Sequence, residues 1–277
     1  MENFTTCKIC NNEIETINVT YNLSQCKKCD FIFYAKIHTQ EEFIKVYDDL
    51  YNNTNAMYKN HSVTEFNNLI SKKKIQIGLN RSKLIDRNIF KSNCKSVLEI
   101  GSGIGLVGSY IRQKNPNIQY TGIELDSEAY KKSKQLGLNT INADFTEIKH
   151  LNNTFDIIML WEVIEHLQDL KLFLELAYSK LNTGGKIILS TPNYNKILNY
   201  PDREKDQLFQ SLPPVHLNFF TTDNIKTIFE LNNFKNCNAV LKKWPYLEIK
   251  LISFYINIIK TIFKKHQGTT IYFEATK

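Results

Sequence analysis

The chain has 277 residues, of which 42% are hydrophobic and 23% are charged, a balance typical of a folded globular protein. Its formal charge of +7 permits contact with anions. Four thiolates bound to one zinc ion would add about −2, so the remaining excess is modest and nucleic acid is not a favoured partner. The sequence shows no secretory signal and no uninterrupted apolar run of about 18 residues, which predicts a protein that is neither exported nor membrane-spanning.

Residues 1–38 are predicted to form a zinc ribbon, because they hold four of the six cysteines in two Cys-x-x-Cys pairs. The predicted zinc ligands are Cys7, Cys10, Cys26 and Cys29. Four thiolates fill the tetrahedral shell of Zn²⁺ and leave no open position, so the predicted role of the ion is structural. Cysteines used as metal ligands indicate a reducing compartment, which predicts a cytoplasmic protein.

Residues 39–94 are predicted to form a helical linker or lid. Thr39-Gln-Glu-Glu42 has the pattern of a capping box, and the helix that it begins carries Tyr47 and Tyr51. Aromatic residues at such positions most often belong to the core. Tyr47 and Tyr51 also occupy a segment that could fold over the mouth of the next domain. Apolar residues at helical spacing predict a further helix over 62–88.

Residues 95–277 alternate between short apolar runs and helical patterns, which predicts an α/β domain with a doubly wound, mostly parallel, seven-stranded Rossmann-like sheet. The final strand, Ile271–Ala275, is expected to be antiparallel and to lie at the edge of the sheet. In such sheets ligands bind at the carboxyl ends of the strands. The first five strands are expected at Ser96–Ile100, Ile118–Glu124, Leu138–Asn142, Phe155–Leu160 and Lys186–Ser190.

A glycine-rich turn, Gly101-x-Gly103-x-Gly105, follows the first of these strands. Leu106 stands where a dinucleotide fingerprint has its third glycine. Glu99 comes two residues before the turn, where its carboxylate would repel a pyrophosphate and attract a cation. The turn therefore favours an adenosine ligand that is positively charged and free of phosphate.

Acids that follow the next two strands favour S-adenosylmethionine as that ligand. Glu124 closes the second strand and is placed to accept hydrogen bonds from the ribose hydroxyls. Asp144 follows the third strand and can accept one from the adenine amino group, with Phe145 beside the ring. The predicted cofactor-binding residues are Glu99, Gly101, Gly103, Glu124, Asp144, Phe145 and Leu160.

From about Lys95 to Asn232, this set of motifs resembles the class I S-adenosylmethionine-dependent methyltransferases. The N-terminal part is similar to a bacterial subgroup in which a four-cysteine ribbon precedes the methyltransferase domain. This chain has Asp30 where that subgroup has a glycine, and it lacks the prolines of the linking segment. The resemblance implies methyl transfer to a small hydroxylated metabolite such as a sugar or glycan precursor, with O-methylation favoured.

Four residues are candidates for the chemistry: Glu162, Glu165 and His166 after the fourth strand, and His216 after the fifth. In one interpretation, His216 or His166 removes the proton of an acceptor hydroxyl. In another, all four bind a divalent cation that lowers the pKa of that hydroxyl, as the resemblance to metal-dependent small-RNA 2′-O-methyltransferases and some quinone O-methyltransferases implies. A purely structural role is the third interpretation.

The segment 247–265 is predicted to be an apolar helix inserted before the final strand. It would pack on its own domain or on a twin subunit in a homodimer, and peripheral membrane contact is the alternative. Two other functions stay open at this point. One is an RNA 2′-O-methyltransferase with a divalent-cation site, and the other is a protein that binds S-adenosylmethionine without turnover.

Overall fold

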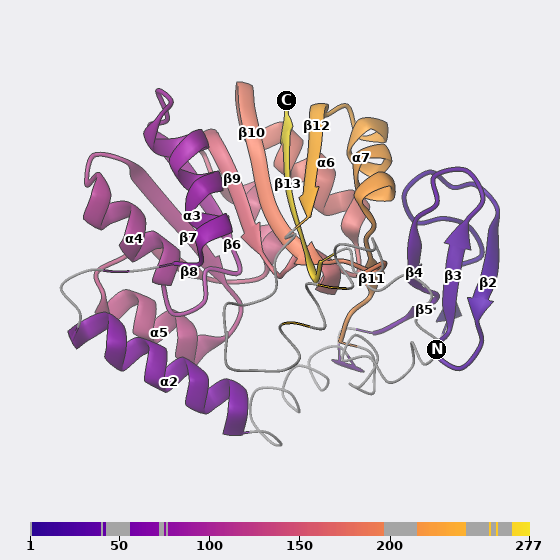
Figure 1. Cartoon of the computed structure of the whole chain (residues 1–277), viewed down its shortest axis with the longest axis horizontal. Helices are drawn as coiled ribbons and strands as arrows, with labels where there is room; N and C mark the ends of the chain where they lie inside the picture. The colour runs from indigo at the N-terminus through magenta and orange to yellow at the C-terminus, as the bar shows by residue number, and fades with distance from the viewer. Residues whose placement is uncertain are drawn as a thin grey trace.

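The computed structural model describes residues 2–39, 41–42, 56–71, 75, 77–196, 215–241, 255, 259 and 268–277. A seven-stranded sheet forms the centre of the molecule (Figure 1). In spatial order its strands are β12 (Lys235–Leu241), β13 (Thr270–Thr276), β10 (Leu181–Pro192), β9 (Phe155–Trp161), β6 (Ser96–Ile100), β7 (Gln119–Glu124) and β8 (Thr140–Asn142). The five strands from β10 to β8 are parallel, which confirms the predicted doubly wound sheet.

The final strand is antiparallel as predicted, but its predicted position at the edge is wrong. β13 pairs with β10 on one side and with β12 on the other, so β12 is the edge strand. The burial of β13 agrees with this place, because Ile271, Phe273 and Ala275 are fully or almost fully buried.

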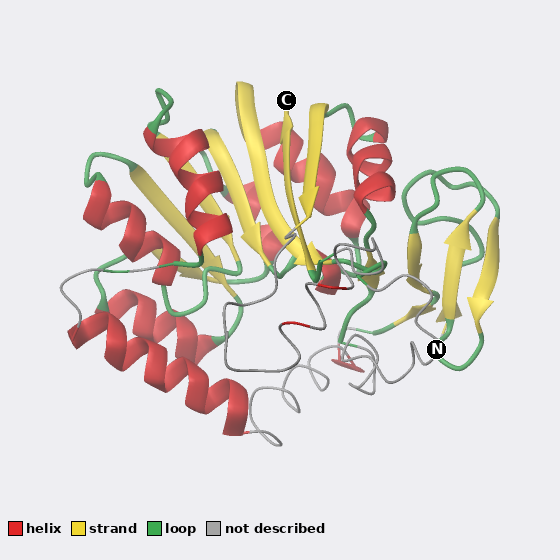
Figure 2. Cartoon of the chain, viewed as in Figure 1, coloured by secondary structure: helices red, strands yellow, loops and turns green. Residues whose placement is uncertain are grey.

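Two apolar cores cover the two faces of the sheet, because successive side chains of a strand point to opposite faces. In β9, Ile158 and Leu160 join the core under α6 and α7, whereas Ile157 and Met159 join the core under α3 and α4. Figure 2 shows the resulting layers of helix, sheet and helix. The α-helices are α2 (Ala56–Ser71), α3 (Leu79–Ile85), α4 (Leu106–Lys114), α5 (Ser127–Gln135), α6 (Leu170–Lys180) and α7 (Thr222–Leu231). The short helical segments in the described part of the chain are η2 (Asp86–Phe90), η3 (Phe145–His150) and η4 (Ile164–His166).

The linker contains helices, but the single helix predicted over 62–88 is wrong. α2 ends at Ser71 and α3 begins at Leu79, directly after Gly78, a residue type that is unfavourable inside a helix. The predicted capping box is confirmed: the Glu42 amide donates to Thr39 Oγ1 over 3.2 Å, and the Thr39 amide donates to the Glu42 carboxylate over 2.9 Å. Tyr47 and Tyr51 lie outside the described residues, as does most of 247–265.

The ribbon forms a sheet with a strand that lies far from it in the sequence. Its own strands are β2 (Ile14–Asn18), β3 (Leu23–Cys26) and β4 (Ile32–Tyr34), and β11 (Asn218–Phe219) pairs antiparallel with β4. A second, two-stranded sheet joins β1 (Glu2–Asn3) to β5 (Lys36–Ile37). Across the described part of the chain, no helix combines the length and the apolar character needed to cross a bilayer.

Asp156 joins the starts of three parallel strands, and we expect its removal to destabilise the sheet. Its carboxylate accepts from the amides of Lys95 (2.7 Å) and Ser96 (3.1 Å) and from the Asn182 side chain (2.8 Å). Asp156→Ala should lower the free energy of unfolding by about 2 kcal/mol in a urea titration. The exposed Glu175→Ala on α6 is the control and should change it little.

The effect of Asp156→Ala should also depend on pH. Burial raises the pKa of Asp156, but the hydrogen bonds from Lys95, Asn182 and Ser96 outweigh it, and the pKa lies below its ordinary value. Asp156 therefore contributes its full stabilisation at pH values above its pKa in the unfolded chain. This stabilisation is lost as the pH falls through the lower pKa that Asp156 has in the folded protein. A difference between variant and wild type that stays constant on acidification would contradict this assignment.

Candidate active site

The turn after β6 brings the backbone close to an open space at the carboxyl end of the sheet. Gly101, Gly103 and Gly105 all have left-handed φ values, of +67°, +55° and +88°. A Cβ at Gly101 would lie 2.5 Å from Val163 Cγ2, so this glycine lets the turn pack on the loop after β9. Among the described residues, no heavy atom lies within 4 Å of a Cβ built at Gly103. A ligand can therefore approach the backbone at Gly103.

Glu124 closes this turn from the end of β7. Its carboxylate accepts from the Gly103 amide over 2.6 Å and from the Asp126 amide over 2.8 Å. Burial raises the pKa of Glu124 although these hydrogen bonds lower it, and only 9% of the residue is exposed. The sequence predicts Glu124 at the end of a strand. In the structure its carboxylate is hydrogen-bonded to the turn that we expect to bind the cofactor.

Glu99 lies deeper, beside two residues that the sequence analysis did not single out. The Tyr120 hydroxyl donates to the Glu99 carboxylate over 2.5 Å, and burial raises the pKa of Glu99 to about 8. The positive charge of Arg81 lowers that pKa. The Arg81 guanidinium lies 5.0 Å from the ring centre of Trp161, whose Nε1 is buried with no hydrogen-bond partner among the described residues. Arg81 lies outside the glycine-rich motif, on α3, so only the folded chain brings it here.

The other predicted cofactor residues lie at or near the same edge of the sheet. Asp144 is exposed and caps η3 by accepting from the Thr146 amide over 2.7 Å. Phe145 packs edge-on against Phe173, with ring centres 5.8 Å apart. Leu160 is fully buried in the core, so its side chain supports the end of β9. The cofactor contacts of these residues stay predictions.

The loop after β9 brings acidic and imidazole groups to the same edge. Glu162 has a left-handed φ of +56°, and its carboxylate accepts from the Ser190 hydroxyl over 2.7 Å. Glu165 is 2% exposed and accepts from the Thr191 hydroxyl over 3.0 Å. Burial, followed by the negative charge of Glu162, raises the pKa of Glu165 well above its ordinary value. Such a carboxylate needs a cationic partner to hold its charge inside the protein.

Three of the four predicted catalytic residues form one cluster. The ligand atoms of Glu165, His166 and His216 all lie within 4.8 Å of one another, a grouping that could hold a metal ion. The two imidazole ring centres are 4.9 Å apart. Glu162 is not in this group, although its carboxylate raises the pKa of Glu165. We name Glu165, His166 and His216 the Glu-His-His cluster.

The orientation of the two imidazoles decides what the cluster can do. His166 Nδ1 lies 2.9 Å from the Val215 carbonyl, which can only accept, so Nδ1 carries the proton and Nε2 keeps its lone pair. Nε2 lies 3.9 Å from the Glu165 carboxylate. His216 Nδ1 is buried with no hydrogen-bond partner among the described residues. Burial lowers the pKa of both histidines, that of His216 to about 3, so both imidazoles are neutral near pH 7.

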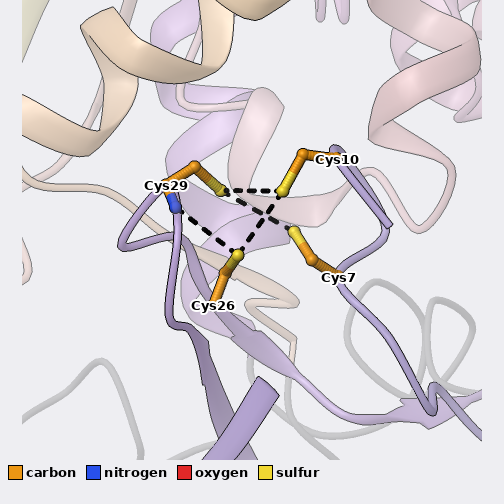
Figure 3. A group of neighbouring side chains, drawn as sticks. All are labelled: Cys7, Cys10, Cys26 and Cys29. Atoms are coloured by element: carbon orange, nitrogen blue, oxygen red, sulfur yellow. Dashed lines mark hydrogen bonds between the residues drawn. The ribbon is translucent and has the colours of Figure 1, made fainter. Parts of the chain in front are cut away.

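The four predicted zinc ligands also converge, as Figure 3 shows. Cys10 Sγ lies 3.5 Å from Cys26 Sγ, and Cys29 Sγ lies 3.7 Å from both Cys7 Sγ and Cys10 Sγ. A tetrahedral Zn²⁺ site with Zn–S bonds of about 2.3 Å has sulfur–sulfur edges of about 3.8 Å. The residues present therefore fit a four-thiolate zinc ion.

Comparisons with known proteins agree with this architecture. A family model described as a methyltransferase domain matches residues 72–239. A ubiquinone biosynthesis O-methyltransferase from Idiomarina loihiensis is 30% identical over 108 residues, which cover 36% of this chain and 44% of that enzyme. The match thus spans less than half of that relative. A tRNA (guanine-N(7)-)-methyltransferase from Mycoplasma mobile is 28% identical over 186 residues, covering 60% of this chain and 90% of that enzyme.

A solved structure shows the same fold. Phosphoethanolamine N-methyltransferase 2 from Haemonchus contortus, in complex with S-adenosyl-L-methionine, has a TM-score of 0.59 and 15% sequence identity. The likeness covers 89% of this chain and 61% of that protein. At this level of identity the comparison supports the arrangement of strands and helices, and the assignment of site residues depends on the geometry described above.

Glu124→Ala should weaken binding of S-adenosylmethionine, because it removes a buried acceptor at the glycine-rich turn. We expect a loss of about 1.5–3 kcal/mol, or roughly tenfold to a hundredfold in Kd, measured by calorimetric titration. The control is Glu128→Ala, an exposed acid on α5 that pairs with Lys131 and should leave the Kd unchanged. Wild-type affinity in Glu124→Ala would remove Glu124 from the site.

Proposed function

The chain belongs to the methyltransferase-domain family, and we propose that it transfers a methyl group from S-adenosylmethionine to a hydroxyl of a small metabolite, such as a sugar or glycan precursor. The observation that carries the proposal is the Glu-His-His cluster beside the glycine-rich turn. The two are neighbours because Gly101 packs on Val163, two residues before Glu165. A hydroxyl acceptor must lose a proton, and this cluster provides the groups that make the loss feasible.

The turn and its acids would hold the cofactor, whose sulfonium supplies an activated methyl group. Glu124 would accept from the ribose, and the open backbone at Gly103 would face the ligand. Burial favours the neutral form of Glu99, and a cationic amino group nearby would stabilise its carboxylate instead. Arg81 lies close enough to act on Glu99 and would provide a counter-charge for the cofactor's own carboxylate. Positioning of methyl donor and acceptor then provides most of the rate enhancement.

Between the two chemical interpretations, the geometry supports cation binding better than a lone base. A metal-binding histidine usually donates its other ring N–H to a backbone carbonyl, and His166 does this toward Val215. Glu165 offers a buried carboxylate, and His216 has a buried nitrogen with no partner among the described residues. With its pKa lowered to about 3, His216 is a weak base near neutral pH. A divalent cation held here would lower the pKa of an acceptor hydroxyl.

Vicinal hydroxyls are the acceptor groups that best match such a site, because an ion held by three protein ligands has open positions that two neighbouring oxygens can occupy together. Sugars carry such pairs, which is why we favour them as acceptors. The charge of the chain gives less support to RNA as the acceptor, because four thiolates bound to zinc would offset part of the formal charge of +7.

His216→Ala should reduce turnover without weakening cofactor binding. The assay incubates zinc-loaded protein with methyl-labelled S-adenosylmethionine and a cell extract, and mass spectrometry identifies the labelled products. We expect a fall of about a hundredfold or more in the labelling rate, with the Kd for S-adenosylmethionine unchanged. His150→Ala, an exposed histidine at the end of η3, should label at the wild-type rate.

Further outcomes of the same assay separate the alternatives. Removal of divalent cations other than the ribbon zinc should stop labelling, and Mn²⁺, a transition-metal ion that accepts imidazole and carboxylate ligands, should restore it. Labelling that survives this treatment would return the chemistry to a histidine base. Label found in RNA would overturn the small-metabolite acceptor, and no label in any product would support cofactor binding without turnover. A normal rate for His216→Ala would remove that residue from the mechanism.

A further inference from the structure

The ribbon contacts the segment that carries His216. Its strand β4 pairs with β11, with Phe33 opposite Asn218 and Ile32 opposite Phe219 (Figure 1). The Tyr34 amide also donates to the Leu217 carbonyl over 3.0 Å. β11 has only two residues and begins two positions after His216, so this strand depends on the ribbon for its pairing.

The ribbon also contacts the segment that carries Glu165 and His166. The His38 amide donates to the Gln168 side-chain oxygen over 2.8 Å, and the Gln168 amide group donates back to the His38 carbonyl over 2.9 Å. Gln168 comes two residues after His166. Both halves of the Glu-His-His cluster are therefore held by hydrogen bonds from one accessory unit.

Asn218 joins the two segments to each other. Its side-chain amide donates to the carbonyls of Ile164 and Leu167, each over 2.8 Å, so it spans the turn η4. The neighbouring Leu217 amide donates to the Glu165 carbonyl over 2.7 Å. Asn218 is 2% exposed, and a buried amide that satisfies two carbonyls is costly to replace.

The cysteine site is directly connected to this contact. The Cys26 amide donates to the Phe31 carbonyl over 2.9 Å, and Phe31 stacks on Phe220 with ring centres 5.8 Å apart. The Asn224 side chain donates to the Asp30 carbonyl over 3.1 Å. The chain segment after the second cysteine pair thus packs against the residues that follow β11.

We propose that the ribbon is a clamp that positions the Glu-His-His cluster, with Gln168 and Asn218 as positioning residues. The proposal rests on the proposed function for its catalytic meaning. The ribbon precedes residue 72, where the match to the methyltransferase-domain family begins, so the clamp adds contacts from outside that matched region. Loss of the clamp should release the two cluster segments and leave the cofactor turn intact, because the turn is held from β7: the Gly103 amide donates to Glu124 and the Gly101 amide donates to the Ile123 carbonyl over 2.9 Å.

Gln168→Ala and Asn218→Asp test the clamp in the zinc-loaded full chain, with the exposed Gln135→Ala on α5 as control. Amide hydrogen exchange should rise about tenfold or more at residues 164–168 and 215–220. Nitrogen-15 spectra of the imidazoles should show loss of the Nδ1–H tautomer of His166, a change that general destabilisation does not produce while the protein stays folded. Gln168→Glu, which keeps the acceptor for the His38 amide, should recover part of the protection.

Removal of zinc from the wild-type chain should have the same effect on both segments, whereas the Kd for S-adenosylmethionine should change less than about twofold. Exchange that rises only within residues 2–39 would overturn the clamp. A parallel loss of cofactor affinity would also overturn it, because the ribbon would then support the whole domain. These readouts need no acceptor, so their failure leaves methyl transfer standing, and a failed transfer assay leaves them unaffected.

Discussion

The hydrogen bond from the Gly103 amide to the Glu124 carboxylate joins the ends of β6 and β7, and the proposed function depends on it. It holds a buried acid against the backbone of the glycine-rich turn. Taking a carboxylate out of water costs several kcal/mol unless donors or a cation compensate. Two backbone amides compensate Glu124, whereas Glu99 has one tyrosine donor and a pKa raised to about 8. A cationic ligand would supply the positive charge that the buried Glu99 carboxylate lacks, and a phosphate would not.

Packing at the carboxyl edge of the sheet also determines where the Glu-His-His cluster lies. Parallel strands end at one edge, so the loops after β6 and β9 meet, and Gly101 has no side chain to separate them from Val163. Here the ribbon adds a strand pairing to one loop and two side-chain hydrogen bonds to the other. A small metal-binding unit thus lies where it can keep Glu165, His166 and His216 together.

Local pattern was sufficient to predict the parallel sheet, the two cysteine pairs and the position of Glu124 at a strand end. It was insufficient where distant segments meet. The pairing of β11 with β4 joins residues nearly two hundred positions apart, and a two-residue strand has no periodicity to detect. Arg81 and Tyr120 reach Glu99 only through packing. The final strand was assigned to the edge because sequence order does not reveal that β12 would lie outside it.

The most direct test of the cofactor assignment is a pair of calorimetric titrations of the zinc-loaded chain, one with S-adenosylmethionine and one with NAD. Both ligands contain adenosine, but only the first is cationic and free of pyrophosphate. Leu106 stands where a dinucleotide turn has glycine, and a pyrophosphate has no positive charge to stabilise the buried Glu99 carboxylate. We predict saturable binding of S-adenosylmethionine and none of NAD. Preferential binding of NAD would contradict the assignment of the glycine-rich turn to S-adenosylmethionine, and with it the proposed methyl transfer.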